Sequence, residues 1–131
     1  MTPERLAEAL EAWNTHNAER VLGYFAGDCA YHASFGPDLL GRSYVGRDEV
    51  LDGVRRFFAR YPNGRFEDTE VFVAGNRGAA EWTFVATEPD GTELRVRGCD
   101  LFEFDGDLIS WRWPVGHPRA DEIGDDRLVA C

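Results

Sequence analysis

One carboxyl group interrupts an otherwise apolar pattern in residues 93–104. Side chains of a β-strand alternate between two faces. One of these faces carries Leu94, Val96, Gly98, Asp100, Phe102 and Phe104. Asp100 would therefore lie among aliphatic and aromatic neighbours with little water, where a charge is costly. We expect such a carboxyl group to hold its proton more firmly or to find a partner, which makes it a candidate for acid–base chemistry.

His32 is the second candidate, because an imidazole can act as a base near neutral pH. It falls in a short predicted strand, residues 29–35, in which both alternating sets contain apolar residues. The pattern therefore does not decide which face of the sheet His32 occupies. For both candidates, a structural hydrogen-bonding role is the alternative interpretation. Large aromatic side chains could line a ligand pocket or fill the core; the pocket candidates are Trp13, Phe57, Tyr61, Trp82, Phe102 and Trp113.

The composition is typical of a single globular domain. The chain has 131 residues, of which 44% are hydrophobic, and this length is enough for a substantial core. The net charge of −10 disfavours binding to nucleic acid or to an anionic membrane surface. No apolar run approaches the roughly 18 residues of a membrane span, and no signal-peptide pattern is visible, so we expect a cytoplasmic protein.

Neither a metal nor an organic cofactor is expected. The three cysteines, at positions 29, 99 and 131, and the three histidines follow none of the usual metal-binding spacings. The sequence contains no Gly-rich dinucleotide fingerprint and no G-x-S-x-G nucleophile motif. All 14 basic residues are arginine, so a Schiff-base lysine and a phosphate-binding lysine are both excluded.

Hydrophobic periodicity predicts the elements that would position these residues. Helical spacing is found in residues 3–13, 18–25 and 48–61. Apolar runs and alternation between turn signals predict strands at 29–35, 66–74, 79–87, 93–104 and 108–115. The short loops between the last four strands predict antiparallel hairpins. Helices followed by antiparallel strands indicate an α+β fold, with the helices packed on one face of the sheet.

This order of elements resembles the nuclear-transport-factor-2-like superfamily, and most closely its SnoaL-like and ketosteroid-isomerase-like branch. The similarity covers roughly residues 3–115 and rests on short motifs in a fixed order. They are Trp13-Asn14-x-His16-Asn17, Val21-Leu22-x-x-Phe25-Ala26-x-Asp28, Gly46-Arg47-Asp48-x-Val50, Glu81-Trp82, Pro89-Asp90-Gly91 and Gly98-x-Asp100-x-Phe102-x-Phe104-Asp105-Gly106-x-Leu108. The resemblance implies a cone-shaped cup, in which a curved antiparallel sheet is covered by three helices from the N-terminal half.

The resemblance also implies a role for Asp100. Ketosteroid isomerases carry an Asp-x-[Met/Phe]-x-Phe strand whose aspartic acid donates a hydrogen bond to the oxyanion, and Asp100 matches that position. The positions that match their general base and their oxyanion tyrosine are Ala33 and Ala9. The implied activity is isomerisation, cyclisation or dehydration of a polyketide- or steroid-like carbonyl compound. Asp100 would be the acid or oxyanion donor and His32 the possible base.

Two other functions stay open at this point. The same cup could bind a hydrophobic small molecule without chemistry, or the chain could be a structural protein that uses only the outer face of its sheet. A base within reach of Asp100 would favour the enzyme. We also expect a homodimer, formed through the outer sheet face that bears Arg95 and Arg97. The predicted domain covers residues 1–118, followed by an acidic C-terminal tail, 119–131.

Overall fold

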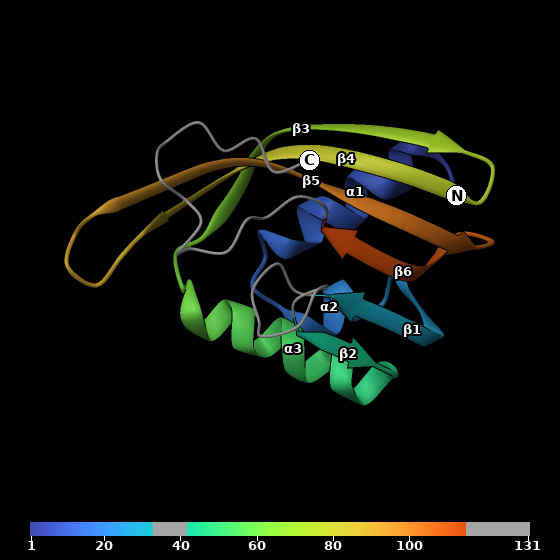
Figure 1. Cartoon of the computed structure of the whole chain (residues 1–131), viewed down its shortest axis with the longest axis horizontal. Coiled ribbons are helices and arrows are strands. Elements are labelled where there is room, and N and C mark those ends of the chain that lie inside the picture. Colours follow the sequence, from blue (N-terminus) through green and yellow to red (C-terminus); the bar gives the residue numbers. More distant parts are fainter. Residues whose placement is uncertain (33–41, 115–131) are drawn as a thin grey trace.

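Nine helices and strands make up the part of the chain that the computed structural model describes, residues 1–32 and 42–114 (Figure 1). The helices are α1 (Pro3–Trp13), α2 (Ala18–Leu22) and α3 (Arg47–Arg60). The strands are β1 (Phe25–His32), β2 (Ser43–Val45), β3 (Arg65–Ala74), β4 (Arg77–Thr87), β5 (Glu93–Asp105) and β6 (Leu108–Pro114). Ala33 and the predicted tail, 119–131, lie outside the described residues, so the domain boundary at residue 118 stays a prediction.

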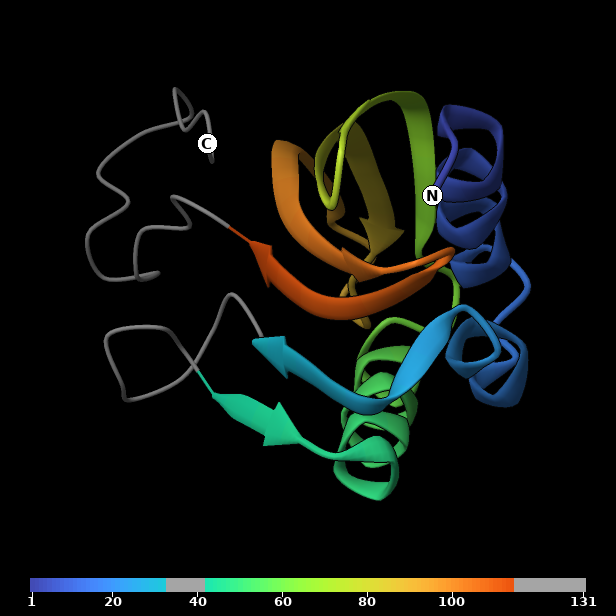
Figure 2. The ribbon, with the colours of Figure 1, turned by 90° about the vertical axis from the view of Figure 1, so that its right-hand side faces the viewer.

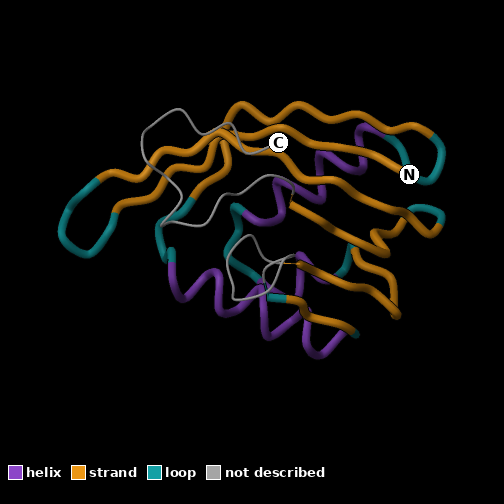
Figure 3. Tube along the Cα trace, in the orientation of Figure 1, coloured by secondary structure: helices purple, strands orange, loops and turns teal. Residues whose placement is uncertain are grey.

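The strands form one six-stranded sheet in the order β2-β1-β6-β5-β4-β3 (Figure 3). Neighbouring strands are antiparallel, except for β1 and β6, which pair in parallel. The sheet is curved, and the helices gather on one side of it (Figure 2). This architecture confirms the predicted α+β cone, with a curved sheet covered by helices from the N-terminal half of the chain.

Three details differ from the prediction, and the first is the parallel pairing of β1 with β6 in a sheet that the sequence predicts to be antiparallel. Residues 43–45 form an edge strand, β2, which is too short for alternation to reveal. The second helix ends at Leu22 rather than near Phe25, because the chain turns at Gly23 and joins the sheet. There the backbone N–H of Ile109 donates to the carbonyl oxygen of Tyr24 at 2.8 Å, and Phe25 pairs with Ile109. Contacts with β6, far away in sequence, therefore set the start of β1.

The first two helices begin where the sequence provides capping side chains. Thr2 Oγ1 accepts a hydrogen bond from the backbone N–H of Arg5 at 3.1 Å, and Pro3 occupies the first turn of α1. Asn17 caps α2 in the same way, because its Oδ1 accepts from the backbone N–H of Arg20 at 3.1 Å. Both caps satisfy backbone donors that the helix itself leaves without a partner.

The core lies between the helices and the sheet face that they cover, which we call the inner face; the opposite side is the outer face. Leu6 of α1 and Val54 of α3 are completely buried, and Cys29, Ala80 and Phe102 join them from β1, β4 and β5. The inner face is therefore the place where the sequence candidates can be sheltered from water.

Within the described ranges, no helix combines the length and the apolar character that crossing a membrane requires.

Candidate functional site

Asp100 lies on the inner face of β5, as the alternation in the sequence predicts. Its side chain has 0% solvent exposure. The antiparallel register places it opposite Ala80 of β4, and Phe102 shares its face two residues further along β5. Both neighbours are buried in the core. The carboxyl group is therefore removed from water, which is the condition that makes its chemistry unusual.

The buried carboxyl group has a hydrogen-bond donor. Trp82 of β4 donates its indole Nε1–H to Oδ2 of Asp100 over 3.0 Å. Trp82 pairs with Gly98 in the β4–β5 register, so it lies diagonally beside Asp100. In surroundings with little water such a bond is stronger than at the surface, and it offsets part of the cost of burying the carboxyl group. Trp82 is therefore a hydrogen-bond partner of the kind that we expect for a buried carboxyl group at Asp100.

Most of the aromatic pocket candidates are linked to Trp82 through a series of ring contacts. Its ring packs edge-on against Phe66 of β3, with 5.2 Å between centroids, and Phe66 stacks on Phe57 of α3 at 6.0 Å. Phe57 in turn contacts Trp13 at 5.6 Å and Tyr61 at 5.5 Å. Four of the six candidates therefore belong to one connected cluster, which reaches the buried carboxyl group through the indole of Trp82.

The two remaining pocket candidates are placed differently. Phe102 stacks on Phe104, with 6.1 Å between ring centroids, within the main core. The backbone of Trp113 pairs with Leu101 of β5, but its side chain lies outside the described part of the structure. That any of the six aromatic residues binds a substrate stays a prediction.

His32 lies on the outer face, away from Asp100. Its neighbour Tyr31 stacks on Tyr44 of β2 at 5.7 Å, and both are buried in the core on the inner face. Because side chains alternate along a strand, His32 points to the other side. There its ring meets the edge of Trp111 at 5.5 Å. The structure therefore does not bring together the two residues that the sequence suggests as acid and base.

The imidazole of His32 is held by its own neighbours on the outer face. Its Nδ1 lies 2.7 Å from Oγ of Ser43, the residue opposite it on β2. The side chain is largely buried, and this desolvation lowers the pKa of His32 below its usual value. His32 is thus a neutral imidazole near pH 7, with a hydrogen bond that joins two strands at the edge of the sheet.

Sequence reasoning missed two residues that shape the surroundings of Asp100. Asn14 looks only like a helix cap, yet its side chain bonds the backbone of Phe66, 52 residues away. Gly98 gives a stronger signal, because a glycine inside a strand often marks a close approach of another group. Here that group is the indole of Trp82, which lies against the backbone of Gly98.

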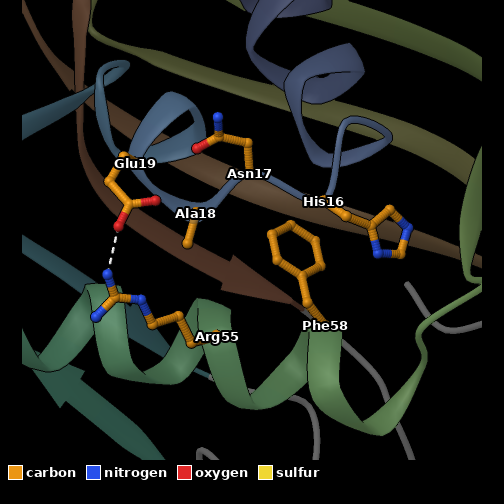
Figure 4. Close-up of a pocket in the computed structure, with 6 residues that line it drawn as sticks. All are labelled: His16, Asn17, Ala18, Glu19, Arg55 and Phe58. Carbon is orange, nitrogen blue, oxygen red and sulfur yellow. Dashed lines mark hydrogen bonds and ion pairs between the residues drawn. The ribbon is translucent and has the colours of Figure 1, made fainter.

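Two surface hollows formed by described residues lie apart from Asp100. The larger, of about 380 Å³, is lined by α2 and α3 residues and their neighbours, namely His16, Asn17, Ala18, Glu19, Arg55 and Phe58 (Figure 4). Its charged side chains are paired, because Glu19 and Arg55 form an ion pair. The smaller, of about 300 Å³, is lined by Arg42, Ser43, Tyr44, Asp48, Glu49 and Asp52. Neither hollow is lined by Asp100 or Trp82.

The described side chains offer no metal centre. Within residues 1–32 and 42–114, no three side chains of His, Cys, Asp or Glu lie close enough together to hold a metal ion. The expectation that the protein works without a metal or an organic cofactor stays a prediction.

The chain is similar in structure to several solved proteins. One from Xanthomonas campestris, provisionally named a polyketide cyclase, is 20% identical with a TM-score of 0.73; the match covers 85% of this chain and 86% of that one. A second provisional polyketide cyclase, from Pseudomonas putida, is 17% identical with a TM-score of 0.75, covering 87% and 90%. A ketosteroid-isomerase-like fold from Catenulispora acidiphila, in complex with trimethylamine, is 21% identical with a TM-score of 0.68, covering 87% and 85%. The TM-scores show a shared fold, and at identities this low the similarity shows the fold alone.

A family model gives the closer assignment, although no curated protein matches the chain in sequence. The model of the SnoaL-like domain matches residues 6–112. This range runs from α1 into β6 and includes Trp82, Asp100 and the aromatic cluster. The chain therefore belongs to the SnoaL-like domain family.

Proposed function

We propose that this protein is a cofactor-independent enzyme that acts on a hydrophobic, carbonyl-bearing small molecule. In this proposal Asp100 is a general acid or an oxyanion hydrogen-bond donor. The reaction is an isomerisation, a cyclisation or a dehydration of a polyketide- or steroid-like compound. One observation carries the proposal: a completely buried carboxyl group stands beside a cluster of aromatic rings on the inner face of the sheet.

A buried acid suits such chemistry because negative charge develops on a carbonyl oxygen when a neighbouring carbon loses a proton. A carboxyl group in its acid form can donate a hydrogen bond to that oxygen from a fixed position. Surroundings with little water strengthen the bond. The aromatic cluster offers an apolar wall against which the rings of a substrate can pack. Charge stabilisation of this kind requires no cofactor.

The family supports the proposal at a coarser level. The chain carries a SnoaL-like domain, and two proteins of the same fold have the provisional name of polyketide cyclase. Cyclisation of a polyketide passes through an enolate, whose oxygen needs a preorganised hydrogen-bond donor. Asp100 is our candidate for that donor, and the relatives, at about one fifth identity, say nothing about individual residues.

A non-catalytic binding module is the second candidate, because one observation favours it. His32, the base expected from the sequence, faces the outer side of the sheet. It therefore cannot take a proton from a substrate held at Asp100, since proton transfer needs hydrogen-bond reach. If no other residue supplies a base to the cup, a donor at Asp100 would bind a carbonyl compound without converting it.

Asp100→Asn distinguishes the two functions. The assay is turnover of a panel of cyclic enones and poly-β-ketone analogues, together with their binding. Asparagine preserves the shape of the side chain, so we expect an intact fold. Turnover should fall by about 10²-fold or more, the usual contribution of a positioned acid. Asp105→Asn is the matched control, since Asp105 ends the same strand and is exposed. Unchanged turnover in Asp100→Asn ends the enzyme proposal in this form. Binding without turnover by the unaltered protein favours the binding module.

A further inference from the structure

We propose that Trp82 is a positioning residue, which holds the carboxyl group of Asp100 in one orientation. The functional meaning of this rests on the proposed role of Asp100. The hydrogen bond from Trp82 Nε1–H to Asp100 Oδ2 is 3.0 Å long, and both side chains are buried. An aspartate side chain turns about two bonds, and a directional donor at one oxygen selects one of its orientations. In this role Trp82 acts through Asp100, in addition to the place of its ring in the aromatic cluster.

Gly98 makes this arrangement possible. It pairs directly with Trp82 in the β4–β5 register. A Cβ added to Gly98 would lie 2.4 Å from Cη2 and 2.8 Å from Cζ3 of Trp82, which is far inside contact distance. The indole thus lies over the bare backbone of Gly98, and its Nε1–H reaches along the sheet to Asp100. Any larger residue at position 98 would push the ring out of this place.

A series of contacts from α1 holds the indole from another side. The ring of Phe66 meets Trp82 edge-on, with centroids 5.2 Å apart and planes at 82°. The backbone of Phe66 is held at both polar atoms by Asn14, because its N–H donates to Oδ1 at 2.8 Å and its carbonyl oxygen accepts from Nδ2 at 2.9 Å. Asn14 is also the C-cap of α1. The end of a helix therefore fixes Phe66, Phe66 limits the indole, and the indole orients Asp100.

A fixed orientation matters because an acid that must first turn toward its substrate reacts more slowly. Groups that are already aligned need no reorganisation during the reaction. Removing the indole N–H, while keeping an aromatic ring, should therefore release the carboxyl group of Asp100 and leave the apolar wall in place.

Trp82→Phe tests this directly. In a crystal structure of this variant, we expect the Asp100 carboxyl group to take a different orientation or two orientations. A single, unchanged orientation would overturn the proposal. Phe84→Leu is the matched control, because Phe84 packs against Phe66 at 5.0 Å within the same cluster. This control disturbs the aromatic packing, and it should leave Asp100 where it is. If Trp82→Phe does not fold, Gly98→Ala displaces the indole instead and should produce the same change at Asp100.

A spectroscopic readout separates orientation by hydrogen bonding from simple packing. With ¹⁵N-labelled tryptophan, the Nε1–H signal of Trp82 is the one that Trp82→Phe removes. In Asp100→Ala this signal should shift, and its exchange with solvent should become about tenfold faster or more, because the acceptor is gone. In Phe84→Leu the signal should stay in place. If the Trp82 signal is unchanged in Asp100→Ala, the proposal is overturned, and this measurement needs no substrate.

Binding of 4-nitrophenolate, a small aromatic oxyanion probe, links the positioning role to the function. We expect Asp100→Ala, which removes the donor, to weaken binding more than tenfold, Trp82→Phe about threefold to tenfold, and the exposed control Asp105→Asn less than twofold. If Asp100→Ala binds the probe normally, the proposed function fails, while the crystal structure and the indole signal still decide whether Trp82 orients Asp100. If Asp100→Ala loses binding and Trp82→Phe keeps it, the positioning role is overturned and the proposed function stands.

Discussion

Arg97 of β5 reaches across β4 and donates a hydrogen bond from Nη1 to the backbone carbonyl oxygen of Asp68 in β3, over 2.9 Å. The same guanidinium group also contacts Thr83 Oγ1 at 3.2 Å and Glu81 Oε2 at 3.1 Å. Asp68 has a positive φ of 50° and lies where the β3–β4 register shifts. Such a bulge bends a strand and increases its twist. Arg97 therefore fixes, from the outer face, part of the curvature of the sheet that surrounds the core.

Arg97→Ala should loosen this bulge. Because the guanidinium group is partly exposed, we expect the free energy of unfolding to fall by only about 1 kcal/mol. Hydrogen exchange of the amides around Asp68 should become faster, while exchange in α1 stays unchanged. Arg95→Ala is the control, since Arg95 is exposed on the same face two residues away and should change stability by less than about 0.5 kcal/mol. Equal exchange in both variants would show that the bulge does not depend on Arg97.

Asn14→Ala should cost more than a typical surface substitution. The variant leaves the N–H and the carbonyl group of Phe66 without their side-chain partner. Because Phe66 is half-buried, we expect a loss of about 1 kcal/mol, the lower end of the cost of an unsatisfied polar group. Asn14→Asp keeps the acceptor oxygen and loses the donor, so its stability should be intermediate. Urea unfolding of the three proteins checks this order. Identical midpoints for Asn14→Ala and the unaltered chain would contradict it.

His32 should make the protein less stable as the pH falls. Burial lowers the pKa of His32 in the folded state, whereas the unfolded chain binds the proton below about pH 6.5. Since the unfolded state then holds more protons than the folded one, stability rises with pH through this range and is lost as the pH falls below about 6.5. His32→Gln should lack this contribution. The difference in unfolding free energy between the two proteins should therefore be larger near pH 7.5 than near pH 5.5, and an equal difference would show that His32 titrates normally when folded.

We propose that the protein forms a homodimer through the outer face of β3, β4 and β5. Phe72 is 68% exposed, and Ala79 and Leu101 stand beside it in the register, which gives an apolar row flanked by Arg97 and Glu81. Phe72→Glu should therefore give a monomer in analytical ultracentrifugation at micromolar concentration, because it puts charge into an apolar contact.

Val45→Glu serves as the control for the dimer. Val45 is also exposed, at 62%, and it lies on β2 at the opposite edge of the sheet. If β3, β4 and β5 form the interface, this variant should keep the mass of the unaltered protein. A monomeric unaltered protein would reject the dimer altogether, and a dimer broken only by Val45→Glu would move the interface to the other edge.

Local patterns in the sequence predict the burial of Asp100 correctly and leave the face of His32 open. In the strand of Asp100, one alternating set is apolar apart from Asp100 itself, and the other carries four charged residues, so only one assignment of faces keeps those charges out of the core. Around His32 both sets contain apolar residues, so the pattern does not decide which face of the sheet His32 occupies. The face is decided by pairing with Ser43 and contact with Trp111, and these residues lie 11 and 79 positions away.

The other differences between the predicted and the observed structure also depend on contacts between residues that are far apart in the sequence. The parallel pairing of β1 with β6 joins the first and the last strand of the described chain, and no local pattern encodes it. The link from Asn14 to Phe66 depends on the place where α1 ends relative to β3, which the packing of the whole fold determines. The α+β class, by contrast, follows from periodicity alone, because helices and strands bury their apolar residues at different spacings.

The missing side chain of Gly98 also restricts the routes by which this site can evolve. A substitution that adds a Cβ at position 98 collides with the ring at 82, whereas a smaller residue at 82 leaves only a gap. Each substitution alone is costly, because a truncated ring leaves a cavity in the core and an added Cβ overpacks the strand. The two positions should therefore change together, and a relative with a larger residue at 98 should carry a smaller residue at 82 and hold its acid by other contacts.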